Sequence, residues 1–236
     1  MFERQLAEVW DLIYRTGRGK EYRGEAEMIA EVVRARNPHA ATLLDVGCGT
    51  GEHVQRLAKL FDHVEGMDLS PHMVAIASAK VPQAAFHVGD MCDFDLGQTF
   101  DAVVSLYTVV GYLPSIDALG AAIERMVAHL APDGVLIVEP WWFTEKFVDG
   151  YIAGDVVRGD GRTVSRVSRT ERRGDHAHMD IHYVVADEQG MEHFTEKHVF
   201  SLWSQDQYLK AFSDAGLEMR YVEDALYCGM FVGQRR

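Results

Sequence analysis

The stretch that most constrains the fold runs from Leu43 to Gly51 and reads Leu-Leu-Asp-Val-Gly-Cys-Gly-Thr-Gly. It begins as an apolar run, passes one acidic residue and ends in three glycines spaced two apart. This pattern predicts a buried strand that turns directly into a helix, because glycine adopts the backbone conformations that such a turn requires and lets a ligand approach the chain closely. A nucleotide-like ligand can then lie across the carboxyl end of the sheet.

The glycine spacing separates two kinds of nucleotide site. The dinucleotide fingerprint requires a third glycine three residues after the second, and Glu52 occupies that position, which disfavours an NAD-dependent oxidoreductase. The spacing resembles motif I of the class I S-adenosylmethionine (SAM) methyltransferases, D-x-G-x-G-x-G, with Asp45, Gly47, Gly49 and Gly51 as the matching residues. This resemblance implies a SAM site in which the ammonium group of the ligand lies near Asp45.

The residue totals exclude several classes of protein. A chain of 236 residues with 47% hydrophobic residues can bury one large domain, or a core domain with an elaboration. The formal net charge of −13 and the lack of a basic patch argue against a nucleic-acid partner. Cys48, Cys92 and Cys228 are odd in number and far apart, which indicates a reducing compartment. No run resembles a signal peptide or a membrane span, so we expect a cytoplasmic protein without a membrane partner.

Strand and helix patterns alternate through the first two thirds of the chain, which predicts a parallel sheet covered by helices on both faces. Before the glycine stretch, apolar residues including Phe2, Leu6 and Trp10 predict a helix up to residue 16, and a second helix follows over 21–36. These helices either close over the site as a lid or cover the sheet edge. Strands are expected at 42–46, 63–68, 85–88, 100–107 and 135–139, and helices at 51–61, at 71–79 and up to the Pro132 turn.

The alternation fails between about residues 162 and 203, where period-two stretches are separated by turn residues at 174–175 and 188–190. Three antiparallel strands are expected there as an insertion. Ser204 and Gln207 match a capping box for a helix over 205–215, and strands at 217–222 and 226–232 complete the sheet.

The expected organisation therefore has four parts. A helical cover occupies residues 1–38, a SAM-binding α/β core 39–148, an antiparallel insertion 149–203, and the C-terminal part of the core 204–236. The insertion is expected to line the substrate pocket or to form a dimer contact, and the chain is expected to be a monomer or a homodimer.

Acidic residues that follow the predicted strands extend the cofactor site. Asp68 ends the second strand about twenty residues after the first glycine, where an acidic residue can hold ribose hydroxyls, although a lone aspartate there is more often a turn residue. By the SAM-enzyme resemblance, Asp90 at the end of the third strand lies near the adenine amino group, and Met91 packs on the adenine. Leu69 completes this predicted cofactor set. The fourth strand lacks the D/N-P-P-Y motif of enzymes that methylate DNA bases.

Over nearly its full length the chain resembles the N,N-dimethyltransferases that finish TDP-linked 3-amino sugars for macrolide antibiotics. The most specific stretch is Glu-Pro-Trp-Trp-Phe at residues 139–143. The other resembling stretches are 17–22, 43–51, 89–94, 110–113 and 229–233. The resemblance implies a Rossmann-like methyltransferase sheet flanked by helices, a small antiparallel sheet near the substrate, the cofactor SAM and the product S-adenosyl-L-homocysteine.

The resemblance also implies residue roles. Tyr22 would approach the methionyl end of SAM, while Tyr112, Glu139 and Trp142 would border an amine acceptor. We expect Glu139 and Tyr112 to be catalytic, with Glu139 orienting the amine, and the alternative for Glu139 is a structural acid at a strand end. The remaining residues of the predicted acceptor site are Tyr14, Tyr107, Trp141, Tyr183 and Cys228.

One departure from the family bears on the acceptor. Cys228 stands where the family carries an arginine that lies near the sugar-nucleotide pyrophosphate. Losing a phosphate-pairing arginine favours a less charged amine of a small natural product, with a TDP-amino sugar as the alternative acceptor. A SAM-binding regulator without turnover is the alternative from another class of protein.

Two histidine patterns are interpreted as structural. His176, His178, Asp180 and His182 alternate along one predicted strand and share a face. Neighbours on that face are about 7 Å apart, so they converge poorly on one ion, and a solvated face is predicted with no metal site. His53, beside the glycine stretch, is expected on a helix surface.

Overall fold

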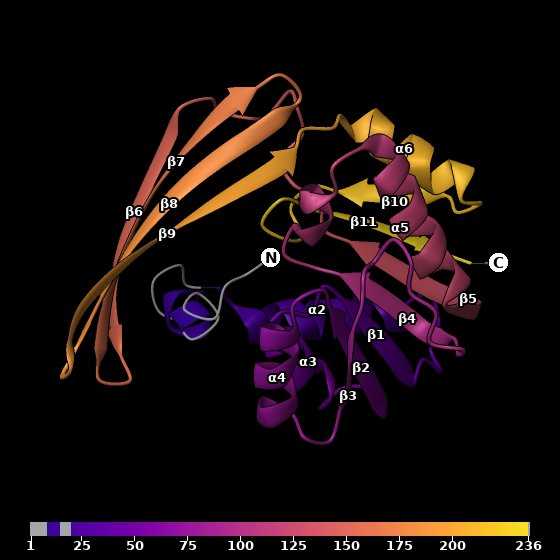
Figure 1. Ribbon diagram of the computed structural model, residues 1–236. Coiled ribbons are helices and arrows are strands. Elements are labelled where there is room, and N and C mark those ends of the chain that lie inside the picture. The colour runs from indigo at the N-terminus through magenta and orange to yellow at the C-terminus, as the bar shows by residue number, and fades with distance from the viewer. Residues whose placement is uncertain (1–8, 15–19, 236) are drawn as a thin grey trace.

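A seven-stranded sheet with the strand order β10-β11-β5-β4-β1-β2-β3 forms the larger part of the fold (Figure 1). The computed structural model describes residues 9–14 and 20–235. All neighbouring pairs from β3 to β5 are parallel, whereas β11 runs antiparallel to β5 and β10. The strands are β1 (Thr42–Val46), β2 (His63–Asp68), β3 (Ala85–Val88), β4 (Phe100–Ser105), β5 (Leu130–Val138), β10 (Met219–Val222) and β11 (Met230–Gln234).

Both faces of this sheet are covered because its central strands are apolar on both faces. One core contains Leu44, Val103 and Leu136 with the apolar sides of α5 and α6, and the other contains Leu43 and Val104 with α2 and α3. The helices are α2 (Tyr22–Arg34), α3 (Glu52–Leu57), α4 (Pro71–Lys80), α5 (Ile116–Ala128) and α6 (Gln205–Asp214), with the 3-10 helix η2 (Val109–Tyr112). The predicted α/β core is confirmed.

Several element bounds differ from the predicted ones. The fourth strand ends at Ser105 because Tyr107 and Thr108 adopt left-handed backbone angles, with φ of 54° and 63°. The strand expected from residue 135 begins at Leu130, so the Pro132 turn is part of β5 rather than a break after a helix. Helix α3 stops at Leu57, four residues earlier than expected.

The insertion is a four-stranded antiparallel sheet rather than the three strands expected. Its strands are β6 (Tyr151–Gly159), β7 (Arg162–Arg173), β8 (His176–Asp187) and β9 (Gly190–Ser201). The missed strand, β6, joins β7 through Asp160 and Gly161, whose φ values of 52° and 73° fit a tight hairpin turn. This Asp-Gly pair is itself a hairpin signal in the sequence.

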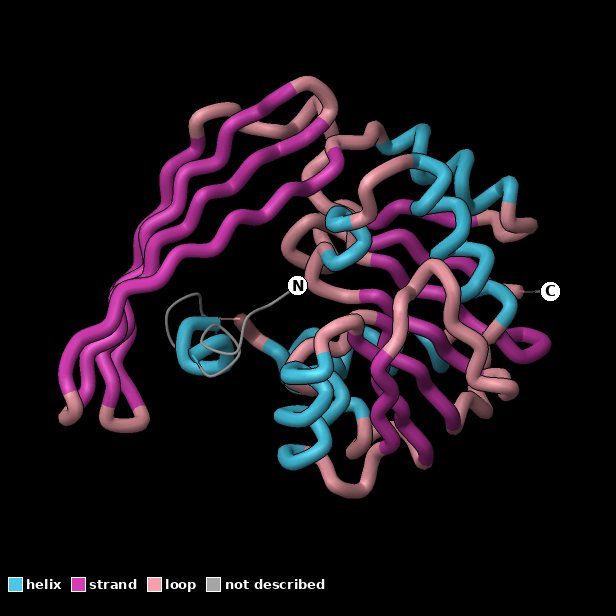
Figure 2. The backbone as a smooth tube through the Cα atoms, in the orientation of Figure 1, coloured by secondary structure: helices cyan, strands magenta, loops and turns pink. Residues whose placement is uncertain are grey.

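The N-terminal segment links the two sheets. Residues 9–14 are helical and lie between the antiparallel sheet and the α/β core (Figure 2). Val9, Leu12 and Ile13 pack with Val164 and Ile181 of the antiparallel sheet. The predicted positions of Phe2 and Leu6, and the helix break at 17–19, lie outside the described residues. The second predicted helix is confirmed as α2.

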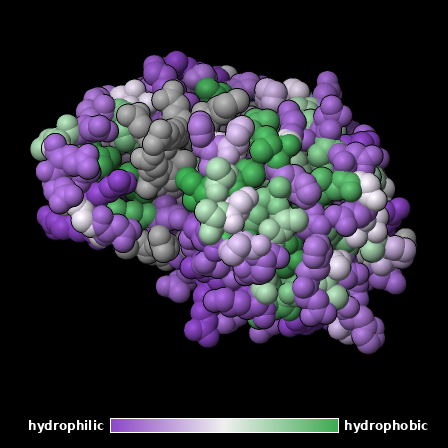
Figure 3. Space-filling model, turned by 60° about the horizontal axis from the view of Figure 1, so that its bottom comes forward, coloured by the Kyte–Doolittle hydropathy of each residue, from purple (hydrophilic) through white to green (hydrophobic). Residues whose placement is uncertain are grey.

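Hydrophilic side chains cover the outer parts of the face shown in Figure 3, with a hydrophobic band across its middle. Within the described ranges, no helix combines the length and the apolar character needed to cross a membrane.

Candidate active site

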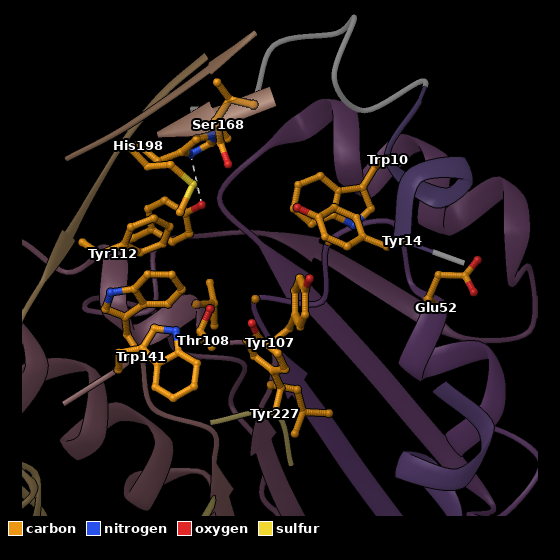
Figure 4. A pocket seen from close by; sticks show the side chains of 18 of the residues that line it. Trp10, Tyr14, Glu52, Tyr107, Thr108, Tyr112, Trp141, Ser168, His198 and Tyr227 are labelled. Atoms are coloured by element: carbon orange, nitrogen blue, oxygen red, sulfur yellow. Dashed lines mark hydrogen bonds between the residues drawn. The ribbon is translucent and has the colours of Figure 1, made fainter. Parts of the chain in front are cut away.

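A cavity of 440 Å³ lies between the carboxyl ends of β1, β2 and β4 and the inner face of the antiparallel sheet. This volume falls within the range of small-molecule sites. In Figure 4, Ser168 and His198 occupy the wall opposite Trp10 and Tyr14, while Tyr107 and Tyr227 lie at its base. The antiparallel sheet and the N-terminal segment therefore close a site that the core alone would leave open.

Asp45 gives the core end of the cavity its chemistry. Its side chain is 1% exposed and lines the cavity, and among the described residues neither carboxylate oxygen has a hydrogen-bond partner. Burial, and secondarily the nearby Asp68, raise the pKa of Asp45 to about 8. A buried carboxylate without a partner is costly, so this site suits a cationic ligand group such as the ammonium of SAM.

The glycine loop is held by the strand-end aspartate. The carboxylate of Asp68 accepts hydrogen bonds from the backbone N–H of Gly49 at 2.9 Å and of Ser70 at 2.8 Å. Gly47 has a φ of 83°, and a Cβ added there would lie 2.7 Å from the Val109 side chain. The loop therefore requires glycine at this position, as the motif predicted.

The structure divides the predicted cofactor residues into two groups. Tyr22, Asp45, Gly47, Gly49 and Asp68 line the cavity. The remaining four lie outside its lining: Gly51, Leu69, Asp90 and Met91. Their predicted contacts with the cofactor stay predictions.

The expectation that His53 is a helix-surface residue is wrong. His53 is buried, pairs with Glu25 at 2.7 Å and lines the cavity beside Tyr22. Burial lowers the pKa of His53. Helix α2 packs on α3 and covers the histidine, and no pattern within α3 alone signals this contact.

The far wall of the cavity is aromatic. Tyr112 of η2 is predicted to be catalytic, and its hydroxyl lies 3.0 Å from the Nδ1 atom of His198 on β9. Burial raises the pKa of Tyr112 and lowers that of His198 to about 4, so a neutral phenol faces a neutral imidazole near pH 7. Trp141 stacks on Phe200 with ring centroids 4.1 Å apart. His198 and Phe200 were not among the predicted site residues.

A second aromatic cluster joins the N-terminal segment to the core. Tyr14 and Tyr107 meet edge to face with ring centroids 5.2 Å apart, and Trp10 packs on Tyr14 at 4.3 Å. The Lys20 ammonium lies 4.0 Å from the centroid of the Tyr107 ring. The structure thus brings the predicted acceptor residues Tyr14 and Tyr107 to the cavity.

Three other predicted residues lie outside the cavity lining. Tyr183 is buried and stacks on Phe194 with ring centroids 4.8 Å apart. Cys228 is buried and borders a smaller cavity of 130 Å³ shared with Trp142, which also lines the main cavity. Glu139 is 0% exposed, and its carboxylate accepts hydrogen bonds from the backbone N–H of Tyr107 at 2.6 Å and of Cys228 at 3.4 Å.

These contacts are those of an acid at a strand end that binds the backbone, and the catalytic role of Glu139 stays a prediction. Burial raises the pKa of Glu139 to about 7. The carboxylate acts on the backbone of Tyr107, where the chain leaves β4 in a left-handed conformation.

We expect Glu139→Gln to keep most of the turnover, because the amide oxygen still accepts the short bond from Tyr107 at 2.6 Å, and only the longer bond from Cys228 at 3.4 Å is lost. Glu139→Ala should lower kcat about tenfold, because a buried N–H without a partner costs about 1–3 kcal/mol. Measuring kcat from pH 6 to 9 tests this. A collapse of turnover in Glu139→Gln would support the catalytic role.

The histidine-rich strand faces outward as predicted. Asp180 and His182 are exposed, and the His182 and His193 rings lie 3.1 Å apart at their nearest nitrogens. In the parts of the chain that the structure describes, no three histidine, cysteine or acidic side chains converge to hold a metal ion.

The sheet order and the glycine loop beside the buried carboxylate of Asp45 define a class I SAM-dependent methyltransferase. Residues 43–134 match the family model described as a methyltransferase domain. A dTDP-3-amino-3,4,6-trideoxy-alpha-D-glucopyranose N,N-dimethyltransferase of Streptomyces venezuelae is 48% identical over 99% of both chains. A dTDP-3-amino-3,6-dideoxy-alpha-D-glucopyranose N,N-dimethyltransferase of Streptomyces fradiae is 45% identical over 92% of this chain and 86% of its own length. The chain belongs to this family of N,N-dimethyltransferases.

Solved structures agree with this family assignment. Streptomyces venezuelae DesVI superposes with a TM-score of 0.95 at 47% identity, covering 100% of both chains. SAM-bound CalS10 superposes with a TM-score of 0.89 at 46% identity, over 100% of this chain and 98% of its own. CalS10 is an amino pentose methyltransferase of Micromonospora echinaspora involved in calicheamicin biosynthesis. The protein is therefore an enzyme, a SAM-dependent N-methyltransferase that acts on a small molecule in secondary metabolism. These relatives are enzymes, so they do not support the alternative that the chain is a SAM-binding regulator without turnover.

Proposed function

We propose that this enzyme methylates the amino group of a nucleotide-linked amino sugar. The observation that carries the proposal is likeness along the whole chain to enzymes named for dTDP-amino sugars, including a third from Saccharopolyspora spinosa at 40% identity over 97% of this chain. Cys228, the departure that favoured a less charged acceptor, lies outside the lining of the main cavity. Its thiol therefore does not argue against a charged acceptor there.

The residues of this chain act by binding and alignment. SAM would supply the methyl group: the C–N bond to the acceptor amine would form as the C–S bond of the sulfonium breaks, with S-adenosyl-L-homocysteine leaving. Asp45 would bind the ammonium of the methionyl group, and the loop at Gly47 and Gly49 would let the ligand lie against the backbone. Tyr112 and Trp141 form the aromatic wall on the acceptor side, where a cationic product is stabilised by cation–π attraction. Alignment of two bound reactants contributes roughly 7–11 kcal/mol in favourable systems.

An alkyl amine has a pKa near 10 and is mostly protonated at neutral pH, so it must lose a proton to solvent water before attack. The neutral Tyr112–His198 pair adds no positive charge to the acceptor side, which limits repulsion of a cationic product.

The test is turnover of SAM with mass detection against dTDP-amino sugars, the same amino sugars without the nucleotide, and heterocyclic amines. We expect a dTDP-amino sugar to gain one or two methyl groups and the free sugar to react far more slowly. Methylation of a heterocyclic amine alone would overturn the proposal and leave the N-methyltransferase assignment intact.

A further inference from the structure

A polar contact in the cavity wall joins the α/β core to the antiparallel sheet. The Tyr112 hydroxyl of η2 lies 3.0 Å from the Nδ1 atom of His198 on β9, and both side chains line the main cavity (Figure 4). His198 is 9% exposed. The Phe200 ring lies beside both rings, with its centroid 4.4 Å from that of Tyr112 and 6.1 Å from that of His198. The hydroxyl and the imidazole therefore meet in an aromatic part of the wall.

The backbone holds the two rings in position. The Ser201 hydroxyl of β9 donates to the Leu113 carbonyl at 2.7 Å, which fixes the end of η2 against β9. A Cβ added at Gly111 would lie 2.7 Å from the Cβ of Trp141, so the close approach of η2 to this part of the wall requires glycine. Because η2 and β9 are fixed on each other, the fold sets the distance between the two polar atoms.

The charges of the pair leave two arrangements of its protons. Burial raises the pKa of Tyr112, and burial, with the nearby Arg166 of β7 as a second cause, lowers the pKa of His198 to about 4. Near pH 7 the phenol is therefore protonated and the imidazole is neutral, with one nitrogen that donates and one that accepts. Either the O–H of Tyr112 donates to Nδ1, or Nδ1–H donates to the phenol oxygen and the O–H turns into the cavity.

The two arrangements act differently on an amine. The attacking nitrogen needs its lone pair directed at the methyl group, so a phenol O–H that donates to this lone pair competes with attack. A phenol that donates its O–H to His198 instead accepts an N–H of the amine and leaves the lone pair exposed. A primary amine offers two N–H groups to the phenol oxygen, a monomethylated amine offers one, and a dimethylated amine offers none. The oxygen can therefore hold the amine before each of two transfers and does not hold the final product.

We propose that His198 is a positioning residue whose Nδ1 accepts the hydrogen bond of the Tyr112 hydroxyl, so that the Tyr112 oxygen accepts an N–H of the acceptor amine. Neither side chain gains or loses a proton in this arrangement, and the proton released by the ammonium goes to solvent water. This role rests on the proposed function in one respect, that the acceptor amine faces the aromatic wall formed by Tyr112 and Trp141.

The position of the imidazole proton is measured first. In the enzyme labelled with ¹⁵N-histidine and loaded with S-adenosyl-L-homocysteine, nuclear magnetic resonance distinguishes protonated from unprotonated ring nitrogens. We expect Nδ1 of His198 to be unprotonated and Nε2 to be protonated near pH 7. The His198 signals are assigned by their absence from His198→Asn. A protonated Nδ1 overturns the inference.

Turnover is then measured with the amine that the wild-type enzyme methylates, and mass detection separates the monomethylated and dimethylated products. His198→Phe should lower kcat about threefold to tenfold, the size of one neutral hydrogen bond, with the acceptor KM changed less than about twofold. The second transfer should slow more than the first, because the monomethylated amine has a single N–H. His198→Asn should recover most of the rate, since its amide oxygen lies as many bonds from the backbone as Nδ1. His193→Phe is the matched control, because His193 is an exposed histidine of the same strand.

Tyr112→Phe separates positioning from packing. If His198 acts through the Tyr112 hydroxyl, the double variant should be no slower than His198→Phe alone, because the O–H that competes for the lone pair is gone. Additive losses in the double variant, or equal slowing of both transfers without recovery in His198→Asn, indicate packing alone and overturn the inference. If the wild-type enzyme methylates no dTDP-amino sugar, the proposed function fails, and the protonation of His198 Nδ1, which needs no acceptor, still tests the positioning role.

Discussion

Replacing Asp45 with asparagine should weaken SAM binding by about tenfold to a hundredfold and stabilise the unliganded protein. The carboxylate is buried and has no partner in residues 9–14 and 20–235, so the ligand ammonium would supply its neutralising contact. An amide of the same shape cannot make that ion pair, yet it is far easier to bury. Isothermal titration with SAM and thermal unfolding without ligand measure the two effects.

The same substitution should change how stability depends on pH. The pKa of Asp45 is about 8 in the folded protein and about 3.9 when unfolded, so the folded state retains the proton between these values. The free energy of unfolding of the wild type therefore falls as pH rises from about 4 to 8, by at most about 1.4 kcal/mol per unit for this group. Asp45→Asn removes that contribution.

SAM binding should show the opposite trend in the wild type. The ammonium requires the carboxylate form of Asp45, so affinity rises from about pH 6 toward 8, and this rise should vanish in Asp45→Asn. Asp62→Asn is the control, because Asp62 is an exposed aspartate of the same core. If Asp45→Asn binds SAM as tightly as the wild type, the ammonium does not lie at Asp45.

The sequence predicts the core well where local pattern and packing agree. The strands at 42–46, 63–68 and 85–88 match their predicted bounds, because turn residues flank each apolar run. The end of β4 was not predictable in this way. The residues after Ser105 are strand-forming by type, and the hydrogen bond that the backbone N–H of Tyr107 donates to the Glu139 carboxylate, far along the chain, contributes to the left-handed turn at Tyr107.

The site was predictable where a motif fixes the residue and not where tertiary packing does. Asp45 and Asp68 follow from the glycine loop and strand ends. His53, Arg166 and His198 reach the cavity only because α2 covers α3 and the antiparallel sheet folds over the core. Period-two spacing does place Arg166 with Ser168 on one face of a strand, which is a usable signal once β7 is recognised.

Lys80→Met should loosen the N-terminal segment from the core and weaken SAM binding. The Lys80 ammonium bonds to Asp11 of the N-terminal segment and lies 2.8 Å from Glu52 of α3. Asp11 also accepts from the Thr50 hydroxyl of the glycine loop at 2.6 Å. The bonds that Lys80 and Thr50 make to Asp11 therefore tie the N-terminal segment, which carries Trp10 and Tyr14, to the glycine loop.

The loss of folding stability expected for Lys80→Met follows from the burial of the side chains that Lys80 contacts. The Lys80 side chain is 16% exposed and that of Glu52 is 4% exposed, so removing the ammonium leaves two poorly solvated carboxylates. Breaking a fully buried ion pair costs about 3–5 kcal/mol. Because Glu52 keeps Arg56 at 2.7 Å and Asp11 keeps Thr50, we expect about 2 kcal/mol, or roughly 4–8 °C in melting temperature.

Hydrogen exchange separates this local effect from global unfolding. In Lys80→Met, amides of residues 9–14 should exchange faster while those of β1 and β4 keep their protection, and SAM affinity should fall about tenfold with the loss of the aromatic cover. Lys59→Met is the matched control, since Lys59 is an exposed lysine of the same core. If exchange and affinity in Lys80→Met match those of this control, the N-terminal segment is held by its apolar contacts with the antiparallel sheet alone, and the ion pairs at Lys80 do not close the site.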